Sequence, residues 1–249
     1  MEAWRRFAFM LLSGNANCVS NVKPKQDELC KRLGEIIKRD PFKVQCLRAL
    51  RSLEVPQGYI GAGFVRNAIW DELHQKVSPT PLNDIDVVYF CDKVTIPNSS
   101  AEYKSTKESL SQLDFYHEAL YAIKSQEQLF QHELSRLVPH ANWQVKNQAR
   151  MHLAHNHSAY RSCHDAISYW IEKETCVAVR LLANDDVDII CPFGLEANFA
   201  GTISINPKYP RSDVFEQRVR SKNWLKTWPL LKVVKKHMRN CKGLLQRNE

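Results

Sequence analysis

Two aspartates separated by one residue, Asp84 and Asp86, are the side chains of this sequence best suited to holding a metal ion. They open the run DIDVVYF at residues 84–90, whose β-branched and aromatic content predicts a strand. Because side chains alternate along a strand, both carboxylates are expected on one face and Ile85 on the other. Two adjacent carboxylates repel unless a cation lies between them. Magnesium prefers oxygen ligands and shares them with phosphates, so we expect magnesium there.

A turn of small residues, Gly61, Ala62 and Gly63, precedes the aspartates and opens a predicted helix at residues 64–75. Glycine lacks a Cβ atom, so the turn can tighten and its backbone amides can face an anion. The N-terminus of the helix adds partial positive charge. We therefore predict a cradle for a triphosphate, with Arg66 placed one turn into the helix to reach the same phosphates. A simple tight turn, followed by two solvated carboxylates, is the alternative interpretation.

The elements that position these residues are read from periodicity and from turn signals. Short helices are expected at residues 26–38 and 42–53, and helical structure within 100–137. Strands are expected at residues 59–60, 84–90 and 143–146, and a hairpin from 177–182 and 187–191. Residues 192–212 should be mostly loop, and Asp213 should cap a final helix that Pro229 interrupts or ends. The class is α/β or α+β: a mixed sheet flanked by helices.

Composition places the chain among ordinary globular proteins. It has 249 residues, of which 44% are hydrophobic and 25% charged, and a formal net charge of +8. The basic surplus favours phosphate-bearing partners. No apolar stretch approaches the ~20 residues of a membrane-spanning helix, so we expect no membrane association. The eight cysteines are scattered and form no CxxC pair, which favours a reducing, cytoplasmic location.

Two further patterns have an ordinary interpretation. His152, His155 and His157 form an HxxHxH pattern without an acid or cysteine at familiar metal-binding spacing, which favours solvated loop histidines. Trp224 and Trp228 are four residues apart, which is more typical of a core or docking surface than of a base-stacking platform.

The order of strand, GAG turn, helix and DID motif resembles the DNA polymerase β-type nucleotidyltransferase superfamily. The resemblance narrows to a small family of bacterial nucleotidyltransferase-like proteins and covers roughly residues 57–230. The matching stretches are GAGFVRNAIWDELH, TPLNDIDVVYF, WQVKNQARMH, YRSCHDAISYWIEKETCVAVRL, CPFGLEANFAG and VFEQRVRSKNWLKTWP. We therefore expect a helical extension at residues 1–55, a nucleotidyltransferase-like domain at 56–231 and a basic tail at 232–249.

The resemblance implies roles for individual residues. In the superfamily the glycine turn holds the nucleotide phosphates, and two acids matching Asp84 and Asp86 hold the metal ions. A third acid on a neighbouring strand completes the set and can act as a base. The matching position here is Gln144, an amide that can coordinate a metal but cannot accept a proton at neutral pH. Asp188 is a substitute for the missing acid, with a carboxylate at a hairpin edge as the alternative. Lys146 would share a strand face with Gln144 and balance phosphate charge, or be part of a polar strand edge.

Three functions follow as hypotheses. The first is a metal-dependent enzyme, using one or two magnesium ions, that transfers a nucleoside monophosphate from an NTP to a hydroxyl acceptor: a small molecule, a protein or RNA. The second, motivated by Gln144, is a non-catalytic nucleotide- or RNA-binding module on the same fold. The third is a dinucleotide-binding Rossmann unit, although Arg66 occupies the position of its third glycine.

Overall fold

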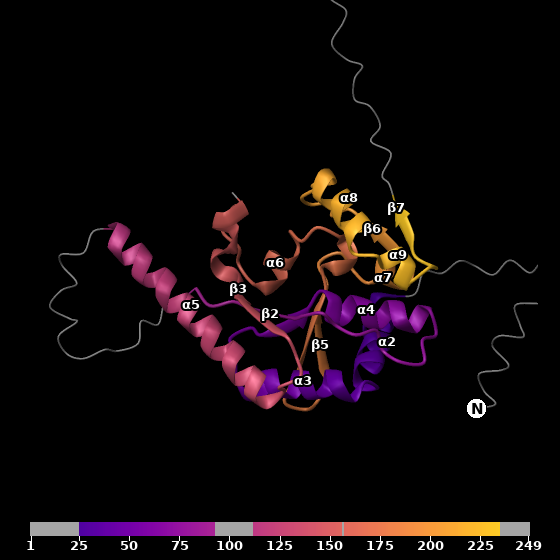
Figure 1. Ribbon diagram of the computed structural model, residues 1–249, viewed down its shortest axis with the longest axis horizontal. Coiled ribbons are helices and arrows are strands. Elements are labelled where there is room, and N and C mark those ends of the chain that lie inside the picture. Colours follow the sequence, from indigo (N-terminus) through magenta and orange to yellow (C-terminus); the bar gives the residue numbers. More distant parts are fainter. Residues whose placement is uncertain (1–24, 93–111, 156, 235–249) are drawn as a thin grey trace, which may run out of the picture.

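A computed structural model of the chain describes residues 25–92, 112–155 and 157–234, excepting the side chains of residues 112–123 and 125. Helices and strands are interspersed along the chain, and Figure 1 shows their arrangement. The α-helices are α2 (Gln26–Lys38), α3 (Pro41–Ser52), α4 (Gly63–Leu73), α5 (Gln112–Leu137), α6 (Cys163–Ile167), α7 (Glu196–Phe199), α8 (Ser212–Ser221) and α9 (Trp224–Thr227). The strands are β1 (Tyr59–Gly61), β2 (Ile85–Tyr89), β3 (Trp143–Asn147), β4 (Ala178–Leu181), β5 (Val187–Ile190), β6 (Thr202–Ser204) and β7 (Lys232–Val234). Two 3-10 helices, η2 (Gln148–His155) and η3 (Lys173–Thr175), lie between β3 and β4.

The central sheet has five strands in the order β3-β2-β1-β4-β5. Strands β2 and β3 are parallel, whereas β1 is antiparallel to both of its neighbours and β4 is antiparallel to β5. The mixed α/β class and the 177–191 hairpin are therefore confirmed. The Rossmann hypothesis is wrong, because a dinucleotide-binding unit needs parallel strands around its first helix and β1 and β2 run in opposite directions.

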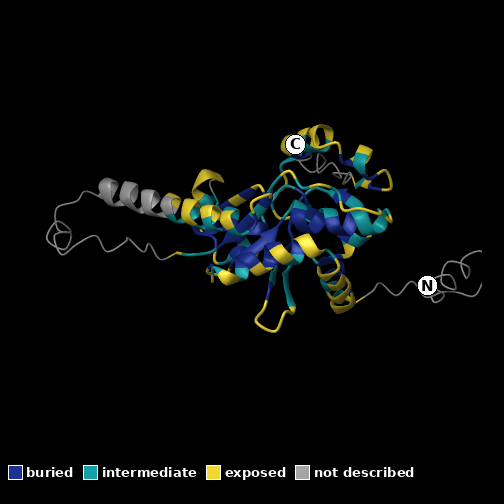
Figure 2. Ribbon diagram, turned by 60° about the horizontal axis from the view of Figure 1, so that its bottom comes forward, coloured by how far each residue is buried: buried dark blue, intermediate teal, exposed yellow. Residues whose placement is uncertain are grey.

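One face of the sheet packs on helices α2 to α5. Alternate side chains of the strands, among them Ile60, Val87, Val145 and Val179, join apolar side chains of these helices in one buried cluster. The N-terminal helices α2 and α3 contribute Leu33, Ile37 and Leu47 to the same cluster, so this part of the predicted extension belongs to the main core. Figure 2 shows the buried residues concentrated along the sheet and on the inner sides of the helices. The core thereby fixes which face of each strand is left for polar residues.

A second apolar cluster joins the C-terminal segment to α4. Trp224 and Trp228 each pack edge-on against the fully buried Trp70, with ring centroids 5.8 and 5.2 Å away. The two tryptophans are therefore core residues, as their spacing favours. Strands β6 and β7 form a small parallel sheet beside them, so the first three residues of the basic segment are a strand. In Figure 1 this unit and α8 lie above the central sheet, on the side opposite α3.

The C-terminal third has more structure than the sequence indicates. Residues 192–212 contain α7 and β6 and are not mostly loop. The N-cap of α8 is Arg211, and Asp213 lies in the first turn of the helix, where its charge still favours the positive end of the helix dipole. The predicted single helix is interrupted before α9, because Asn223 adopts a left-handed conformation with φ of 53°. This break turns Trp224 towards Trp70.

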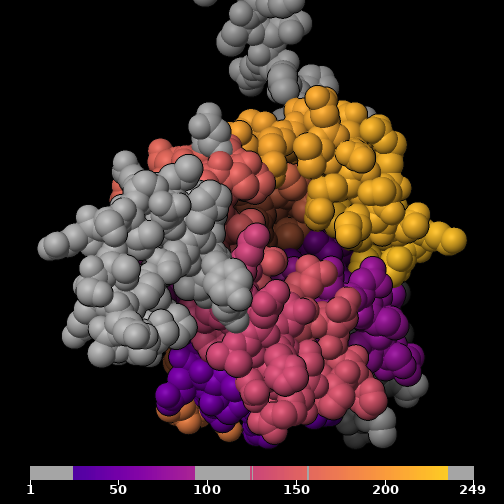
Figure 3. Space-filling view, turned by 60° about the vertical axis from the view of Figure 1, so that its left-hand side comes forward, coloured from indigo at the N-terminus to yellow at the C-terminus, as the bar shows by residue number. Residues whose placement is uncertain are grey.

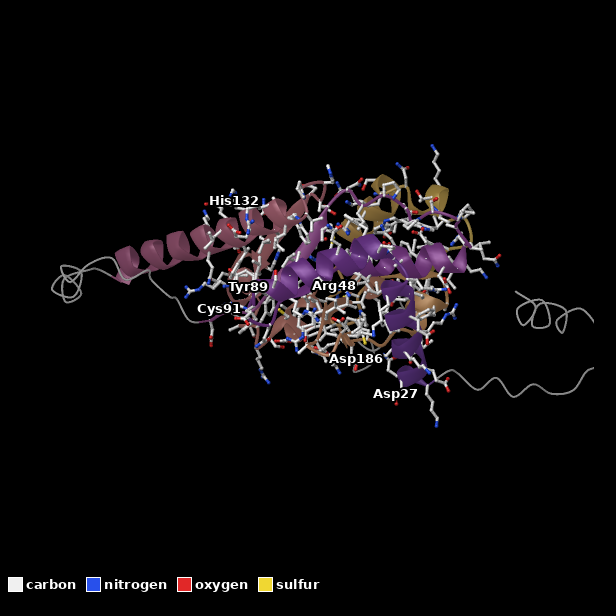
Figure 4. All side chains as sticks on the ribbon, turned by 90° about the horizontal axis from the view of Figure 1, so that it is seen from below. Asp27, Arg48, Tyr89, Cys91, His132 and Asp186 are labelled. Carbon is white, nitrogen blue, oxygen red and sulfur yellow. The ribbon has the colours of Figure 1, made fainter. Side chains whose placement is uncertain are left out.

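Charged contacts fasten α3 to the β4–β5 turn at the edge of the sheet. Arg48 and Arg51 of α3 both form ion pairs with Asp185 in that turn. Figure 4, seen from below, shows Arg48 and the neighbouring Asp186 on this side of the molecule.

Residues 1–24 and 235–249, the outer parts of the two predicted terminal segments, lie outside the described residues. Over the described part of the chain, no helix is both long and apolar enough to cross a membrane.

Candidate active site

The two aspartates lie beside one another at the start of β2. Ile85 and Val87 are 2% and 0% exposed in the main core, so the alternation of β2 turns Asp86 to the other face, and both Asp84 and Asp86 line one cavity there. Burial and the neighbouring Asp84 carboxylate raise the pKa of Asp86 to about 6, although nearby cations oppose the shift. Bringing these two carboxylates together therefore has an electrostatic cost that a bound cation would relieve.

Gln144 occupies the position beside the pair on the next strand. In the parallel register of β2 and β3, Gln144 is the partner of Asp86, and its Nε2 donates to Oδ2 of Asp84 at 3.4 Å. The oxygen donors assembled here are two carboxylates and one amide. Across residues 25–92, 112–155 and 157–234, no group of three or more His, Cys, Asp or Glu side chains is placed to hold a metal ion. A cation bound by this set would therefore complete its coordination with water or substrate oxygens, as magnesium often does.

The GAG turn connects β1 to α4 and faces the aspartates. Ala62, the N-cap of α4, has φ of 52° and ψ of −122°, a conformation that costs free energy for a residue with a Cβ atom. Gly61 is closely packed: a Cβ atom there would lie 3.0 Å from Ala178 Cβ and 3.1 Å from the Trp170 ring. At Gly63 the nearest atoms would be 3.7 Å away. The first amides of a helix have no intrahelical acceptor, so those of Gly63 and Phe64 remain available to an anion.

A cavity of about 360 Å³ lies between this turn and the aspartates. We call it the turn cavity. Its walls come from the GAG turn and α4, the loop before β2, the carboxylate pair and the C-terminal segment from α8 to α9. Its lining residues include Gly63, Asn67, Asp84, Asp86, Arg218 and Lys222. The turn and the carboxylate pair that the sequence singles out thus line one open cavity.

Arg66 follows the turn in α4, and most of its side-chain interactions are with other residues of the protein. Its side chain is buried, Nη1 donates to Thr175 Oγ1 at 2.7 Å and Nη2 donates to Asn67 Oδ1 at 3.0 Å. The guanidinium also lies over the rings of Trp70 and Trp224, 4.9 and 4.7 Å from their centroids. Burial lowers the pKa of Arg66 to about 10. It lines the turn cavity, but the structure gives it chiefly the role of joining α4 to the C-terminal segment.

Two cations that the sequence analysis does not single out, Arg218 and Lys222, reach the turn cavity from α8 and its C-cap. Nε and Nη2 of Arg218 donate to the two carboxylate oxygens of Glu172 at 2.6 and 3.2 Å. Glu172 is 1% exposed and also accepts from Thr175 Oγ1 at 2.9 Å. This side-on pairing leaves both N–H groups of Nη1 for a ligand. Lys222 forms no ion pair with any residue that the structure describes.

A second cavity, of about 270 Å³, adjoins the turn cavity at Asp86. We call it the β3 cavity, because β3 supplies Gln144 and Lys146 to its wall. Lys146 shares the exposed face of β3 with Gln144, as the sequence predicts. Its Nζ also pairs with Glu127 of α5 at 3.2 Å, which partly neutralises its charge. Asp86, Ala62, Thr175 and Arg218 line both cavities, so the two spaces meet at the aspartate.

Asp188 does not join this site, and its prediction as the missing acid is corrected. It lies on β5, three strands from β2 in the sheet order. Its Oδ2 accepts from Arg180 Nε at 2.7 Å and from the Tyr59 hydroxyl at 2.8 Å. With strands about 4.8 Å apart, β5 is about 14 Å from β2. Asp188 is therefore an ion-paired carboxylate at the hairpin edge, which is the alternative that the sequence left open.

A mixed sheet that sets a small-residue turn opposite two aspartates defines a polymerase β-like nucleotidyltransferase fold. A profile of the family described as Nucleotidyltransferase matches residues 48–115 and 98–233. The chain belongs to this nucleotidyltransferase family. A solved NMR structure, described as revealing a CCA-adding enzyme head domain, is similar to the chain with a TM-score of 0.61 and 27% sequence identity. The match covers 86% of this chain and 98% of that chain. No curated protein matches the chain.

Proposed function

We propose that the protein is a metal-dependent nucleotidyltransferase that transfers a nucleoside monophosphate from an NTP to a hydroxyl acceptor. The observation that carries the proposal is the turn cavity, where Asp84 and Asp86 face the GAG turn across a space that cations also line. Anion-binding amides, cations and a carboxylate pair in one cavity suit a triphosphate and its metal ion. The likeness to a structure described as revealing a CCA-adding enzyme head domain supports transfer.

The donor set fits magnesium. Asp84, Asp86 and Gln144 offer oxygen ligands for a hard cation, and burial together with the Asp84 carboxylate raises the pKa of Asp86. When bound there, magnesium would polarise the α-phosphate and neutralise charge that develops during transfer. The protein's own contribution is to hold the two carboxylates on one strand face beside the amide of Gln144.

The phosphates would be held from two sides. The free amides at the start of α4 approach from the GAG turn. Nη1 of Arg218 and the ammonium of Lys222 approach from α8. Glu172 keeps Arg218 in place from a fully buried position. Because donors with fixed positions stabilise developing charge without reorganising, this arrangement favours departure of pyrophosphate into the turn cavity.

Gln144 supports a second candidate function. It stands beside Asp86 at the position of the superfamily's third acid, and an amide cannot take the proton of an acceptor hydroxyl. A non-catalytic module that binds nucleotides through the turn cavity is the function that this residue favours. The two candidates differ in one measurable product, pyrophosphate.

The test combines binding with turnover. The purified protein is titrated with each NTP in a calorimeter, with and without magnesium, and pyrophosphate release is measured with a mixture of hydroxyl acceptors. Asp84→Asn and Asp86→Asn should each lower magnesium-dependent NTP affinity at least tenfold and abolish pyrophosphate release. Glu216→Gln is the matched control and should behave as wild type, because Glu216 is an exposed acid of α8 whose ion pair among the described residues is with Arg220 at 3.7 Å.

Each outcome is decisive for one of the two functions. NTP affinity in Asp86→Asn equal to that of the wild type would refute the assigned role of the carboxylate pair. Magnesium-dependent NTP binding without pyrophosphate release, across all acceptors tested, would favour the non-catalytic module.

A further inference from the structure

The two cavities have fixed positions relative to Asp86. The turn cavity is lined by Gly63 and Lys222, and the β3 cavity adjoins it at Asp86, with Gln144 in its wall. In phosphoryl-group transfer the attacking and leaving oxygens lie roughly in line across the phosphorus. If pyrophosphate departs into the turn cavity, the acceptor hydroxyl has to approach from another direction, and the adjoining β3 cavity, which also reaches Asp86, offers that approach. This step rests on the proposed function.

The β3 cavity has walls of two chemical kinds. Met151, Trp170 and Ile171 give it an apolar side, and the amides of Gln144 and Gln148 give it hydrogen-bonding groups near the carboxylate. At about 270 Å³ this space lies just below the usual range of ligand cavities, about 300–1,000 Å³, so it suits a single ring system and not a larger ligand. A flat group with polar edges, such as a nucleoside, satisfies both kinds of wall.

Arg211 supplies the charge that selects the acceptor. It lines the β3 cavity from the N-cap of α8, and its Nε is buried without a hydrogen-bond partner. Within the part of the chain that the structure describes, its guanidinium has no ion pair, only a position 5.7 Å from the Tyr209 ring centroid. A guanidinium without an acid partner prefers an anionic ligand, phosphate above all. Cationic acceptors are disfavoured at this wall.

Aromatic and basic side chains continue outward from Arg211. His157 stacks on Tyr169 with ring centroids 4.4 Å apart and meets Tyr209 edge-on at 4.3 Å. Lys208 Nζ lies 3.9 Å from the Tyr169 centroid. His157 is therefore packed among tyrosines and is not the solvated loop histidine that the sequence favours. Interleaved rings and cations are typical of surfaces that bind single-stranded nucleic acid. Figure 3 shows a hollow on this face between the salmon segment around η2 and the orange segment that carries α8.

We propose that the β3 cavity binds the 3′-terminal nucleotide of a single-stranded polynucleotide, with Arg211 on its 5′-phosphate and the preceding nucleotides over the His157–Tyr169–Tyr209 cluster. The terminal hydroxyl oxygen forms a bond to the α-phosphorus of the NTP, and the bond from that phosphorus to the β-bridging oxygen breaks. Pyrophosphate leaves, and the hydroxyl proton passes to solvent water. The products are a strand longer by one nucleotide, pyrophosphate and a proton.

The binding test uses the full-length protein without NTP or metal. A 5′-fluorescein single-stranded RNA 12-mer, the matching DNA 12-mer and unlabelled AMP as competitor separate a strand end from a free mononucleotide. We expect Arg211→Ala to weaken oligonucleotide binding at least tenfold and to reduce the salt dependence by about one phosphate contact. Arg211→Lys should recover part of the affinity. Arg220→Ala, an equal charge change on α8 outside both cavities, should change the affinity less than twofold.

The extension test adds magnesium and radioactive NTP. An RNA with a 3′-hydroxyl should be lengthened by the wild-type protein, and the same RNA with a 3′-phosphate should not. Equal oligonucleotide affinity in wild type, Arg211→Ala and Arg220→Ala would overturn the assignment of the β3 cavity, as would competition by AMP at the affinity of the 12-mer. Calorimetric NTP binding keeps the two proposals separate: a protein that binds NTP but no oligonucleotide retains the proposed function and loses this acceptor.

Discussion

The two glycines of the GAG turn are expected to respond to the same substitution in opposite ways. At Gly61 a methyl group would meet Ala178 Cβ at 3.0 Å, the Trp170 ring at 3.1 Å and the Val177 carbonyl oxygen at 3.1 Å. Overpacking of this kind costs about 1–3 kcal/mol of folding free energy. Alanine also restricts the unfolded chain more than glycine does, and this offsets about 0.4–1 kcal/mol of that cost. Gly61→Ala should therefore lose about 1–2 kcal/mol of stability, lowering Tm by about 2–8 °C for a domain of this size.

At Gly63 the same methyl group has room, since its nearest neighbours would be Arg66 Nη2 and the Asn67 amide at 3.7 Å. Both residues line the turn cavity, so the methyl group would project towards the space proposed for phosphate. Gly63→Ala should leave the free energy of unfolding unchanged or raise it by up to about 1 kcal/mol. Its Tm should therefore be equal to or slightly above that of the wild type. Its magnesium-dependent NTP affinity should fall at least tenfold, about 1.4 kcal/mol.

The assay for both variants is thermal unfolding monitored by circular dichroism, followed by calorimetric titration with NTP at a temperature where each is folded. Wild-type NTP affinity in Gly63→Ala would refute the idea that the turn holds phosphates. An unchanged Tm in Gly61→Ala would refute the packing argument, because it would mean that Trp170 moves away at no cost.

Two further substitutions test a buried acid at the site and an acid outside it. Glu172→Gln removes the buried charge that fixes Arg218. Denaturant unfolding should show that its free energy of unfolding falls by about 1–3 kcal/mol, and its NTP affinity should fall as well. The control Glu216→Gln should lower the free energy of unfolding by less than about 0.5 kcal/mol. Asp188→Asn should leave NTP affinity and pyrophosphate release within twofold of wild type, while Asp86→Asn abolishes release; a loss of release in Asp188→Asn equal to that in Asp86→Asn would return Asp188 to the site.

Local patterns were sufficient to predict the part of the site that lies on one strand and one turn. The alternation of residues 84–90 predicts that Asp84 and Asp86 share a face, and the structure places both in the turn cavity. Helix and strand positions up to β5 follow from periodicity for the same reason: each depends on side chains close in sequence. Residues 192–212 were predicted less well, because α7 and β6 are only four and three residues long and are stabilised by contacts with distant segments.

The rest of the site depends on pairing between distant segments. Asp188 and Gln144 are both polar residues on predicted strands, and only the sheet order shows that β3 adjoins β2 while β5 lies at the opposite edge. Arg218 reaches the cavity because the break at Asn223 lets Trp224 dock on Trp70, a contact between residues far apart in sequence. Arg66 did carry a local signal: it is four residues before Trp70 on α4, which places it on the face that this buried ring occupies.

The amide at position 144 makes a prediction about the cation itself. In Gln144→Glu a donor to Asp84 becomes a third carboxylate beside Asp86, whose pKa is already raised to about 6. Gln144 is exposed, so the added repulsion should cost only about 0.5–1 kcal/mol in the absence of divalent ions, which lowers Tm by about 1–4 °C. Magnesium should reverse the loss and raise Tm further than it does in wild type, because a cation shared by three carboxylates is bound more tightly and stabilises the folded state in proportion.

Gln128→Glu, the same chemical change on the exposed surface of α5, should give the magnesium response of the wild type, and this contrast decides the argument. Position 144 adjoins the pair through the strand register and through its hydrogen bond to Asp84, so a larger response specific to it would require the cation to lie beside β2 and β3. Identical responses in the two variants would mean that the cation, if bound, is held elsewhere. The alignment of Asp86 with Gln144 would then be a feature of the sheet and not of the metal site.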